Sequence, residues 1–395
     1  MRFSTNIKYY FIADIISLLG SNLALIALDW FILEKTGFNE NVGIFMSLGM
    51  VAGLIAAPFG GIITDQLCRK TTIINLNYFR AFSILCILLV LVYREFNIYC
   101  VYFLAIINGI GFNIYLPASR ALLQEIIQHK EFTKWNSLIE IGIHITMVAA
   151  GAITGILYKT CGIYFILFLD ALSFVVSNFF MSQIRYEHTI KTSTDNVLSK
   201  LYDVSIYIKN NKSLSVFILV MLTPHVATIT LSIVLPGYVL NHLNSNSGTY
   251  GLLNMFLSIG AIIGAIIMSR LHRKHVKNHH IRFMFIASLL SLLITIFTWS
   301  IPMAYVTILI FGLSNSSIKI IAHSTIMRLT DKAFMGRIVS IKNSISTVLQ
   351  MISAYTIGLV MDKYGDISGY FSLLVIMTVS FLAYLYFNKY FKRLL

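Results

Sequence analysis

The chain has 395 residues, of which 57% are apolar and only 12% are charged, and its formal net charge is +14. The charged share is about half of that in ordinary soluble domains, and a soluble protein of this length could not bury so much apolar surface. This composition excludes a soluble enzyme. It also argues against a nucleic-acid binder, because basic loops crowded on one membrane face explain the positive charge better.

Apolar stretches long enough to span a bilayer recur along the sequence, separated by short polar breaks. A span needs about 20 apolar residues, and it must satisfy its backbone hydrogen bonds within the segment, so we expect each stretch to be a helix. We predict twelve spans, at 9–33, 43–63, 73–93, 99–118, 137–157, 163–184, 214–238, 249–269, 283–300, 304–324, 339–361 and 370–388.

Basic residues are unevenly divided between the two sets of connectors. Of the 30 Lys and Arg, four lie in the six short connectors and two lie inside spans, which leaves 24 for the other connectors and the two termini. The positive-inside rule therefore predicts a multi-pass protein of the cell (inner) membrane with both termini in the cytoplasm. The four cysteines have neither paired nor metal-binding spacing, and we expect no metal and no cofactor.

The sequence divides into two related halves. A polar segment at 185–213, whose second part VLSKLYDVSIYIKNN has helical apolar spacing, separates residues 1–184 from residues 214–395. GGIITDQLCRK at 60–70 matches GAIIMSRLHRK at 264–274, and WNSLIEI at 135–141 matches KNSISTV at 342–348. The prediction is an all-α membrane protein of two pseudo-symmetric six-helix bundles, joined by a cytoplasmic linker with an amphipathic surface helix. Such a duplication is typical of transporters whose halves move about a central site.

The first of these repeats resembles the signature loop of the major facilitator superfamily. Its glycine, acid and basic pair are Gly61, Asp65, Arg69 and Lys70, and the second copy keeps Arg273 and Lys274 but has Ser269 in place of the acid. The resemblance implies that this loop stabilises one conformation of the transport cycle. Arg69 and Lys70 are expected to hold the cytoplasmic ends of the helices together through ion pairs.

Further stretches resemble the branch of macrolide-efflux permeases and the enterobactin exporter. They are APFGGIITD (57–65), the Arg80-Ala81 pair, PASRALLQEIIQHKEFTKWNSL (117–138), LDALSF (169–174), YGLLNMFLSIGAIIGA (250–265) and GRIVSIKNS (336–344). The resemblance implies export of an amphipathic drug, antibiotic or siderophore by proton antiport. Gly142, Gly151 and Gly155 follow the antiporter glycine motif, but Ile156 replaces its proline, which weakens the case for antiport.

Acids and histidines within the spans are candidates for proton coupling, because ionisable groups in the membrane are costly. Asp29 could exchange a proton for substrate, or it could be a wetted residue near the outer end of its helix. Glu140 and His144 are four residues apart and share a helix face, which is suited to a proton relay. The alternative for Glu140 is an ion pair at the cytoplasmic mouth with a loop lysine such as Lys134.

Basic residues within the spans are candidates for contact with the substrate. Arg80 could bind an acidic group, although a structural pair with Asp14 is the better interpretation, since both lie near the same membrane face. Lys319 and His323 share a helix face and could attract an anionic substrate, or Lys319 could snorkel toward a polar neighbour.

Two transport functions remain, and they share one architecture. The first is a secondary active exporter of an amphipathic small molecule, with protons, substrate and the lipid bilayer as its partners and the monomer as its expected state. The second is an importer or facilitator of a nutrient or metal chelate. The sequence has no G-x-x-x-x-G-K-[ST] loop for ATP and no G-x-S-x-G or H-E-x-x-H motif, so we expect a protein that is not an enzyme.

Overall fold

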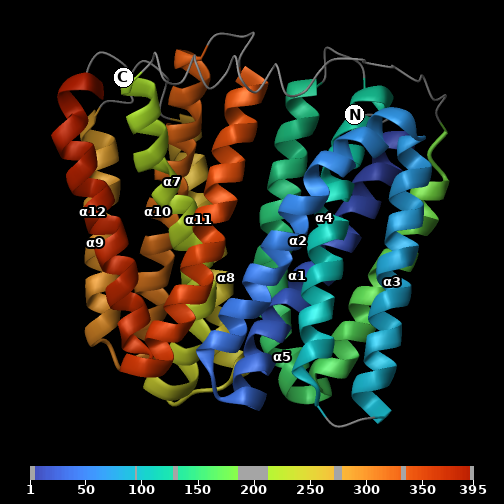
Figure 1. Ribbon diagram of the computed structural model, residues 1–395, viewed down its shortest axis with the longest axis horizontal. Helices are drawn as coiled ribbons and strands as arrows, with labels where there is room; N and C mark the ends of the chain where they lie inside the picture. Colours follow the sequence, from blue (N-terminus) through green and yellow to red (C-terminus); the bar gives the residue numbers. More distant parts are fainter. Residues whose placement is uncertain are drawn as a thin grey trace. The chain divides into compact units, whose positions relative to one another are not determined.

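The computed structural model describes residues 5–93, 96–127, 132–185, 212–270, 278–330 and 335–391, and these residues are almost entirely helical. Figure 1 shows the helices as long rods. They are α1 (Thr5–Thr36), α2 (Asn39–Gln66), α3 (Arg69–Tyr93), α4 (Ile98–Ile126), α5 (Phe132–Ser182), α7 (Lys212–Gly237), α8 (Ser247–Arg270), α9 (Asn278–Phe297), α10 (Ile301–Leu329), α11 (Met335–Tyr364) and α12 (Ile367–Phe391), with the π-helical turn η2 (Tyr238–His242) after α7.

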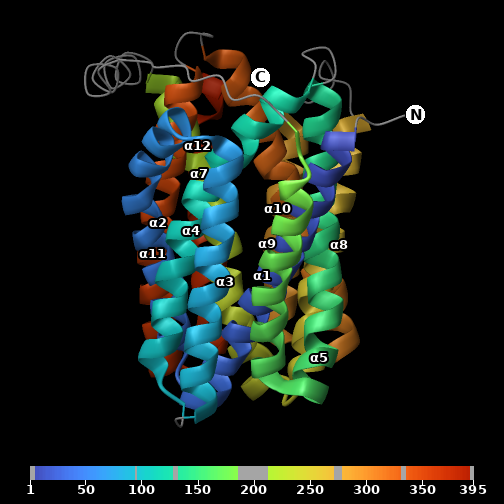
Figure 2. The same cartoon turned by 90° about the vertical axis from the view of Figure 1, so that its right-hand side faces the viewer.

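Within the described ranges, eleven helices are long and apolar enough to cross a membrane, where the sequence predicts twelve spans. The difference arises in α5, which contains both predicted spans 137–157 and 163–184 in 51 residues. Gly162 interrupts this helix with φ 75° and ψ 178°, a backbone conformation that glycine adopts without a Cβ clash. The chain reverses direction within α5, as Figure 2 shows.

The chain separates into two compact units. Unit 1 comprises residues 1–193 together with 246–255, and unit 2 comprises residues 194–245 and 256–395. The first turns of α8 thus belong to unit 1, although they follow α7 in sequence. The linker predicted at 185–213, with its amphipathic helix, lies outside the described residues apart from its two ends.

Each unit is held together by packing between its own helices. In unit 1, α1 packs along α5, α2 along α4, and α3 between α4 and α5. In unit 2, α7 contacts α10, α11 and α12, and α9 lies against α10 and α12. One buried apolar cluster of unit 1 contains Tyr10, Tyr115, Leu122 and Trp135 and joins α1, α4 and α5. This packing fixes where the few polar side chains inside each unit can lie.

Candidate functional site

Arg80, on α3, lies at the centre of a polar network in unit 1. Its Nη2 donates hydrogen bonds to Oδ1 of Asn108 at 3.1 Å and to Oγ of Ser21 at 3.4 Å. Its guanidinium carbon stands 4.0 Å from the ring centre of Phe174. Asp170 accepts a hydrogen bond from Ser21 at 3.5 Å and interacts electrostatically with Arg80. Arg80 therefore links four elements of the unit, α1, α3, α4 and α5.

The expected pair of Arg80 with Asp14 is wrong. Asp14 instead accepts a hydrogen bond from the Tyr115 hydroxyl at 2.6 Å. Arg80 meets α1 at Ser21, seven residues beyond Asp14, which is about 10 Å along a helix. The two side chains therefore meet α1 and α4 at different levels and take different partners.

Asp29 is deeply buried near the end of α1, with 2% of its surface exposed. The hydroxyl of Tyr250, in the first turns of α8, lies within electrostatic reach of this carboxylate. One carboxylate oxygen, Oδ1, has no hydrogen-bond partner in the part of the chain that the structure describes. The Tyr250 ring also stacks on Trp30, with 5.5 Å between ring centres. The wetted position considered for Asp29 is therefore wrong in this structure.

Close to this pair, α5 and the first turns of α8 touch backbone to backbone at glycines. A Cβ added to Gly151 would stand 2.5 Å from the backbone nitrogen of Met255, and one added to Gly251 would stand 2.5 Å from the Gly151 carbonyl oxygen. A Cβ on Gly155 would stand 2.7 Å from the Ser247 carbonyl oxygen. Only glycine permits so close an approach. Two of the three glycines of the predicted antiporter motif thus form this helix crossing.

The third glycine of that motif and the proposed relay lie further along α5. Gly142 has ordinary spacing, since an added Cβ would stand 3.4 Å from the Phe11 ring. His144 is partly buried on α5. The side chains of Glu140 and Lys134 lie outside the described residues, so both the relay and the alternative pairing of Glu140 stay predictions.

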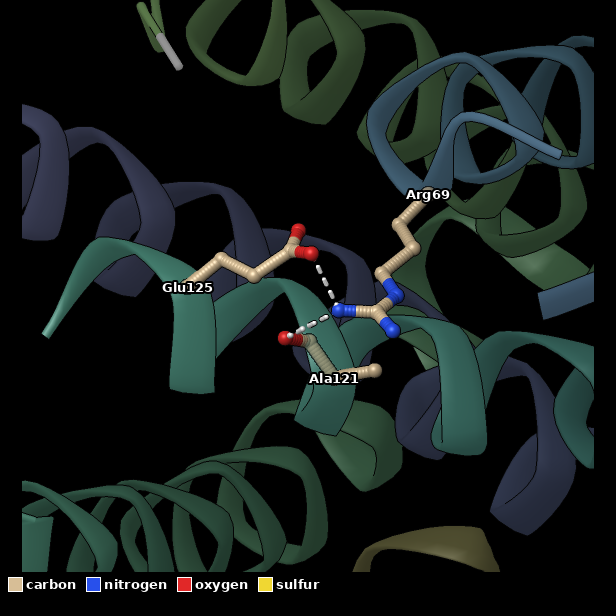
Figure 3. A network of polar contacts seen from close by, with 3 residues as sticks. All are labelled: Arg69, Ala121 and Glu125. Atoms are coloured by element: carbon tan, nitrogen blue, oxygen red, sulfur yellow. Dashed lines mark hydrogen bonds and ion pairs between the residues drawn. The ribbon is translucent and has the colours of Figure 1, made fainter. Parts of the chain in front are cut away.

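The predicted gating loop joins three helices of unit 1 at one end (Figure 3). Arg69, at the start of α3, forms an ion pair with Glu125 of α4 and donates a hydrogen bond to the Ala121 carbonyl at 3.4 Å. Lys70 donates to the carbonyl oxygens of Ser182 and Ile184, at 2.7 and 2.8 Å, at the end of α5. Glu125 was not among the predicted gate residues, although it lies in the stretch 117–138 that carries the family resemblance.

The other four residues of the predicted gate lie wholly or partly outside the described residues. Gly61 and Asp65 belong to α2, but the surroundings of both and the side chain of Asp65 are outside the described part of the chain. Arg273 and Lys274 fall in 271–277, which is also outside the described residues. Their roles remain predictions.

In unit 2 the structure places Lys319 and His323 on the face of α10 that looks toward α7. The Lys319 ammonium donates a hydrogen bond to Oγ1 of Thr228. The charges of Lys319 and His323 both act on His225, one residue after Pro224 in α7, and so does the charge of Lys342 on α11. Lys342 was not among the predicted site residues, because the stretch KNSISTV at 342–348 indicated only the start of a membrane span. The four basic residues are discussed as a group below.

An apolar groove runs between α2 and α4 of unit 1. Its lining is made of aliphatic side chains and one phenylalanine: Leu48, Val51, Ala52, Ile55, Ala56, Phe59, Ile106, Ile110 and Ile114. A surface of this kind suits the apolar part of an amphipathic molecule.

The long apolar helices, together with charged side chains buried between them, define a polytopic membrane protein. Residues 10–354 match the Major Facilitator Superfamily, and the chain belongs to that family. This confirms the resemblance carried by the loop at 60–70.

Two bacterial proteins are similar to the chain in sequence. Macrolide efflux protein A of Streptococcus pyogenes is 20% identical over 267 residues, which cover 66% of this chain and 66% of that protein, slightly under two thirds. The uncharacterized MFS-type transporter YkuC of Bacillus subtilis (strain 168) is 22% identical over 403 residues, which cover 96% of this chain and 91% of that protein.

Solved transporter structures share the fold at low sequence identity. A mutant of the nucleoside transporter NupG superposes with a TM-score of 0.80 at 11% identity, covering 96% of this chain and 99% of that one. A bacterial homologue of the iron transporter ferroportin in the inward-facing state gives 0.79 at 14% identity, with 98% and 99% coverage. The D-xylose-proton symporter gives 0.77 at 12% identity, with 98% and 97% coverage. These likenesses concern the fold alone.

Proposed function

We propose that the protein is a secondary active exporter that moves an amphipathic small molecule out of the cell in exchange for protons. The observation that carries this proposal is Asp29, a carboxylate with one unpartnered oxygen and 2% exposure inside a membrane-spanning helix. A group of this kind is costly unless it binds something during the cycle. The name of the Streptococcus pyogenes relative supports the outward direction.

The proposed topology has twelve crossings in two six-helix bundles, with both termini on the cytoplasmic side. The reversal at Gly162 supports it, because residues 132–161 and 163–182 of α5 are each long enough to cross a bilayer. The excess of Lys and Arg on one set of connectors supports the orientation. Reporter fusions after residues 36, 185 and 391 would test the assignment.

In the proposed coupling step, a proton binds to Asp29 and changes its contact with Tyr250. The ionised carboxylate attracts the tyrosine hydroxyl, which lies within electrostatic reach of it, and a charge-assisted hydrogen bond between the two groups is roughly twice as strong as a neutral one. Protonation weakens this link between α1 and the first turns of α8. The same turns of α8 form the glycine crossing with α5, so the proton bears directly on the contact that we propose to open and close.

Everted membrane vesicles with an imposed pH gradient would test this coupling. Rhodamine 6G and carboxyfluorescein, a cationic and an anionic amphipathic dye, serve as transported probes. Asp29→Asn should abolish gradient-driven accumulation at unchanged protein level, and Tyr250→Phe should reduce it. Asp362→Asn is the matched control, because Asp362 is an exposed acid at the far end of α11. Full gradient-driven transport by Asp29→Asn would refute the coupling role.

The second candidate is an importer or facilitator with the same fold. The nucleoside transporter and the D-xylose-proton symporter among the structural neighbours keep this alternative open. It predicts that intact cells expressing the protein take up the probe, and that Asp29→Asn and Glu140→Gln leave uptake unchanged. The exporter predicts the opposite, a lower probe content in intact cells than in cells without the protein.

A further inference from the structure

The C-terminal unit contains four basic side chains within electrostatic reach of one another, and its described helices place no acid beside them. They are His225 of α7, Lys319 and His323 of α10, and Lys342 of α11. The sequence has no Asp or Glu between residues 204 and 330, and none in α11 before Asp362. Asp362 is 20 residues beyond Lys342, which is about 30 Å along a helix. The helices of this unit therefore supply no counter-charge beside the group.

The two lysines of this group have few hydrogen-bond acceptors among the described residues. Lys342 is 7% exposed, yet in the described part of the chain its ammonium has neither a hydrogen bond nor an ion pair. Lys319 makes one hydrogen bond, to Thr228. Since an ammonium has three N–H donors, the pair leaves five donors without protein acceptors. The His225 imidazole is buried beside them, and the one described neighbour that interacts with it through its backbone is Met221, one turn earlier in α7.

Local structure holds this arrangement in place without neutralising it. The Thr228 hydroxyl donates to the Pro224 carbonyl at 3.0 Å and accepts from Nδ2 of Asn315 at 2.9 Å, so its hydrogen-bonding capacity is used. Pro224 cannot donate to the Val220 carbonyl, which instead accepts from Ser380 at 2.9 Å. The Pro224 and Val220 carbonyl groups beside His225 thus have partners, whereas most N–H donors of the two ammonium groups have no acceptor among the described residues.

We propose that His225, Lys319, His323 and Lys342 form a binding site for an oxyanion, a carboxylate or phosphate group of the transported molecule. Two lysines and two imidazoles provide several charge-assisted donors, the usual way in which proteins hold such groups. Isolated charges in a membrane protein interior are costly, and an anionic ligand supplies the missing partner. This inference rests on the proposed transport function and narrows its substrate to amphipathic anions, unlike a macrolide, which carries a basic amine.

Citrate binding to the purified full-length protein in neutral detergent, measured by calorimetry, tests the site without any proton gradient. Wild type should bind citrate but not triethyl citrate, its uncharged ester. Lys319→Met and Lys342→Met should each weaken binding by about tenfold or more, since each removes charge-assisted hydrogen bonds. Lys342→Arg should retain binding. Lys363→Met is the matched control, because Lys363 lies in the last turn of α11, far from the group.

Several results would overturn the proposal. The first is that the wild-type protein does not bind citrate, and the second is that wild type and both methionine variants bind citrate equally well. The third is that phosphatidylglycerol raises the melting temperature and citrate does not, which would assign the site to a lipid headgroup. If Lys342→Met does not fold, Lys319→Met and His225→Asn carry the same comparison. Loss of proton coupling in Asp29→Asn with intact citrate binding would separate the two proposals, since the binding measurement does not depend on Asp29.

Discussion

The glycine crossing between α5 and the first turns of α8 makes a prediction that can be worked from distances. In Gly151→Ala the new Cβ would stand 2.5 Å from the Met255 backbone nitrogen. Ordinary contact begins at 3.4 Å, so the helices must separate by about 0.9 Å. The clash is with backbone, which cannot rotate away, and overpacking of this kind costs about 1–3 kcal/mol.

That cost acts only on the state in which the two helices touch. If the crossing opens during the transport cycle, as we propose, a penalty of about 1–3 kcal/mol shifts the equilibrium toward the open state by about 5- to 150-fold. Alanine also gains up to about 1 kcal/mol of helix propensity over glycine. Gly142→Ala on the same helix shares this gain without the clash, because its Cβ would stand 3.4 Å from the nearest atom. The difference between the two variants therefore isolates the crossing.

A cysteine replacing Ser247 reports on the crossing, since Ser247 is 6% exposed and its hydroxyl faces the Gly155 carbonyl at 3.5 Å. In a background without the four native cysteines, a membrane-impermeant maleimide should label Ser247→Cys faster when Gly151→Ala is present. Gly142→Ala should leave the labelling rate unchanged. Equal labelling and equal transport in the two alanine variants would refute the view that the contact must be this close and must open.

Three further outcomes follow from the polar contacts of unit 1. Arg80→Lys should lower the unfolding free energy by about 1–3 kcal/mol, because it loses buried hydrogen bonds, and an unchanged melting temperature of the purified protein would contradict this. Glu125→Gln should slow transport with little loss of stability. The double variant Glu125→Gln with Arg69→Gln should transport no more slowly than Glu125→Gln alone. Additive effects of the two substitutions would mean that the two side chains do not act as one ion pair. Gly20→Ala should reduce the folded yield, since its Cβ would stand 2.1 Å from the Ser173 hydroxyl, and Ser173→Gly should restore it in the double variant.

The sequence was sufficient for the membrane fold because length and hydropathy alone decide which segments can span a bilayer. It also indicated most helix positions, since no span depends on a distant partner for its backbone hydrogen bonds. The helix count differed only at the connector 158–162, where the sequence predicts a break and the structure continues the helix up to Gly162. One glycine with positive φ is enough to reverse the chain, so two predicted spans fall within one helix.

The candidate site was harder to predict, because partners depend on helix depth and rotation. Arg80 and Asp14 look like a pair in the sequence, but Ser21 and Tyr115 take their places. The sequence identified Lys319 as a buried cation but missed Lys342 beside it, and the two are brought together only by the packing of α10 and α11 around α7.

The proposed proton site and the proposed anion site belong to different units, and their charges have an energetic consequence. Import of one proton and export of one singly charged anion both move positive charge inward, so each cycle transfers two charges. An interior-negative potential then drives export with about 4.6 kcal/mol per 100 mV, twice the value for one charge. A cation exporter with the same proton stoichiometry would transfer no net charge. In vesicles clamped with potassium and valinomycin, export of carboxyfluorescein, which carries more than one negative charge, should therefore rise with the potential at constant pH gradient. An export rate that ignores the potential would be incompatible with the exchange of a proton for an anion.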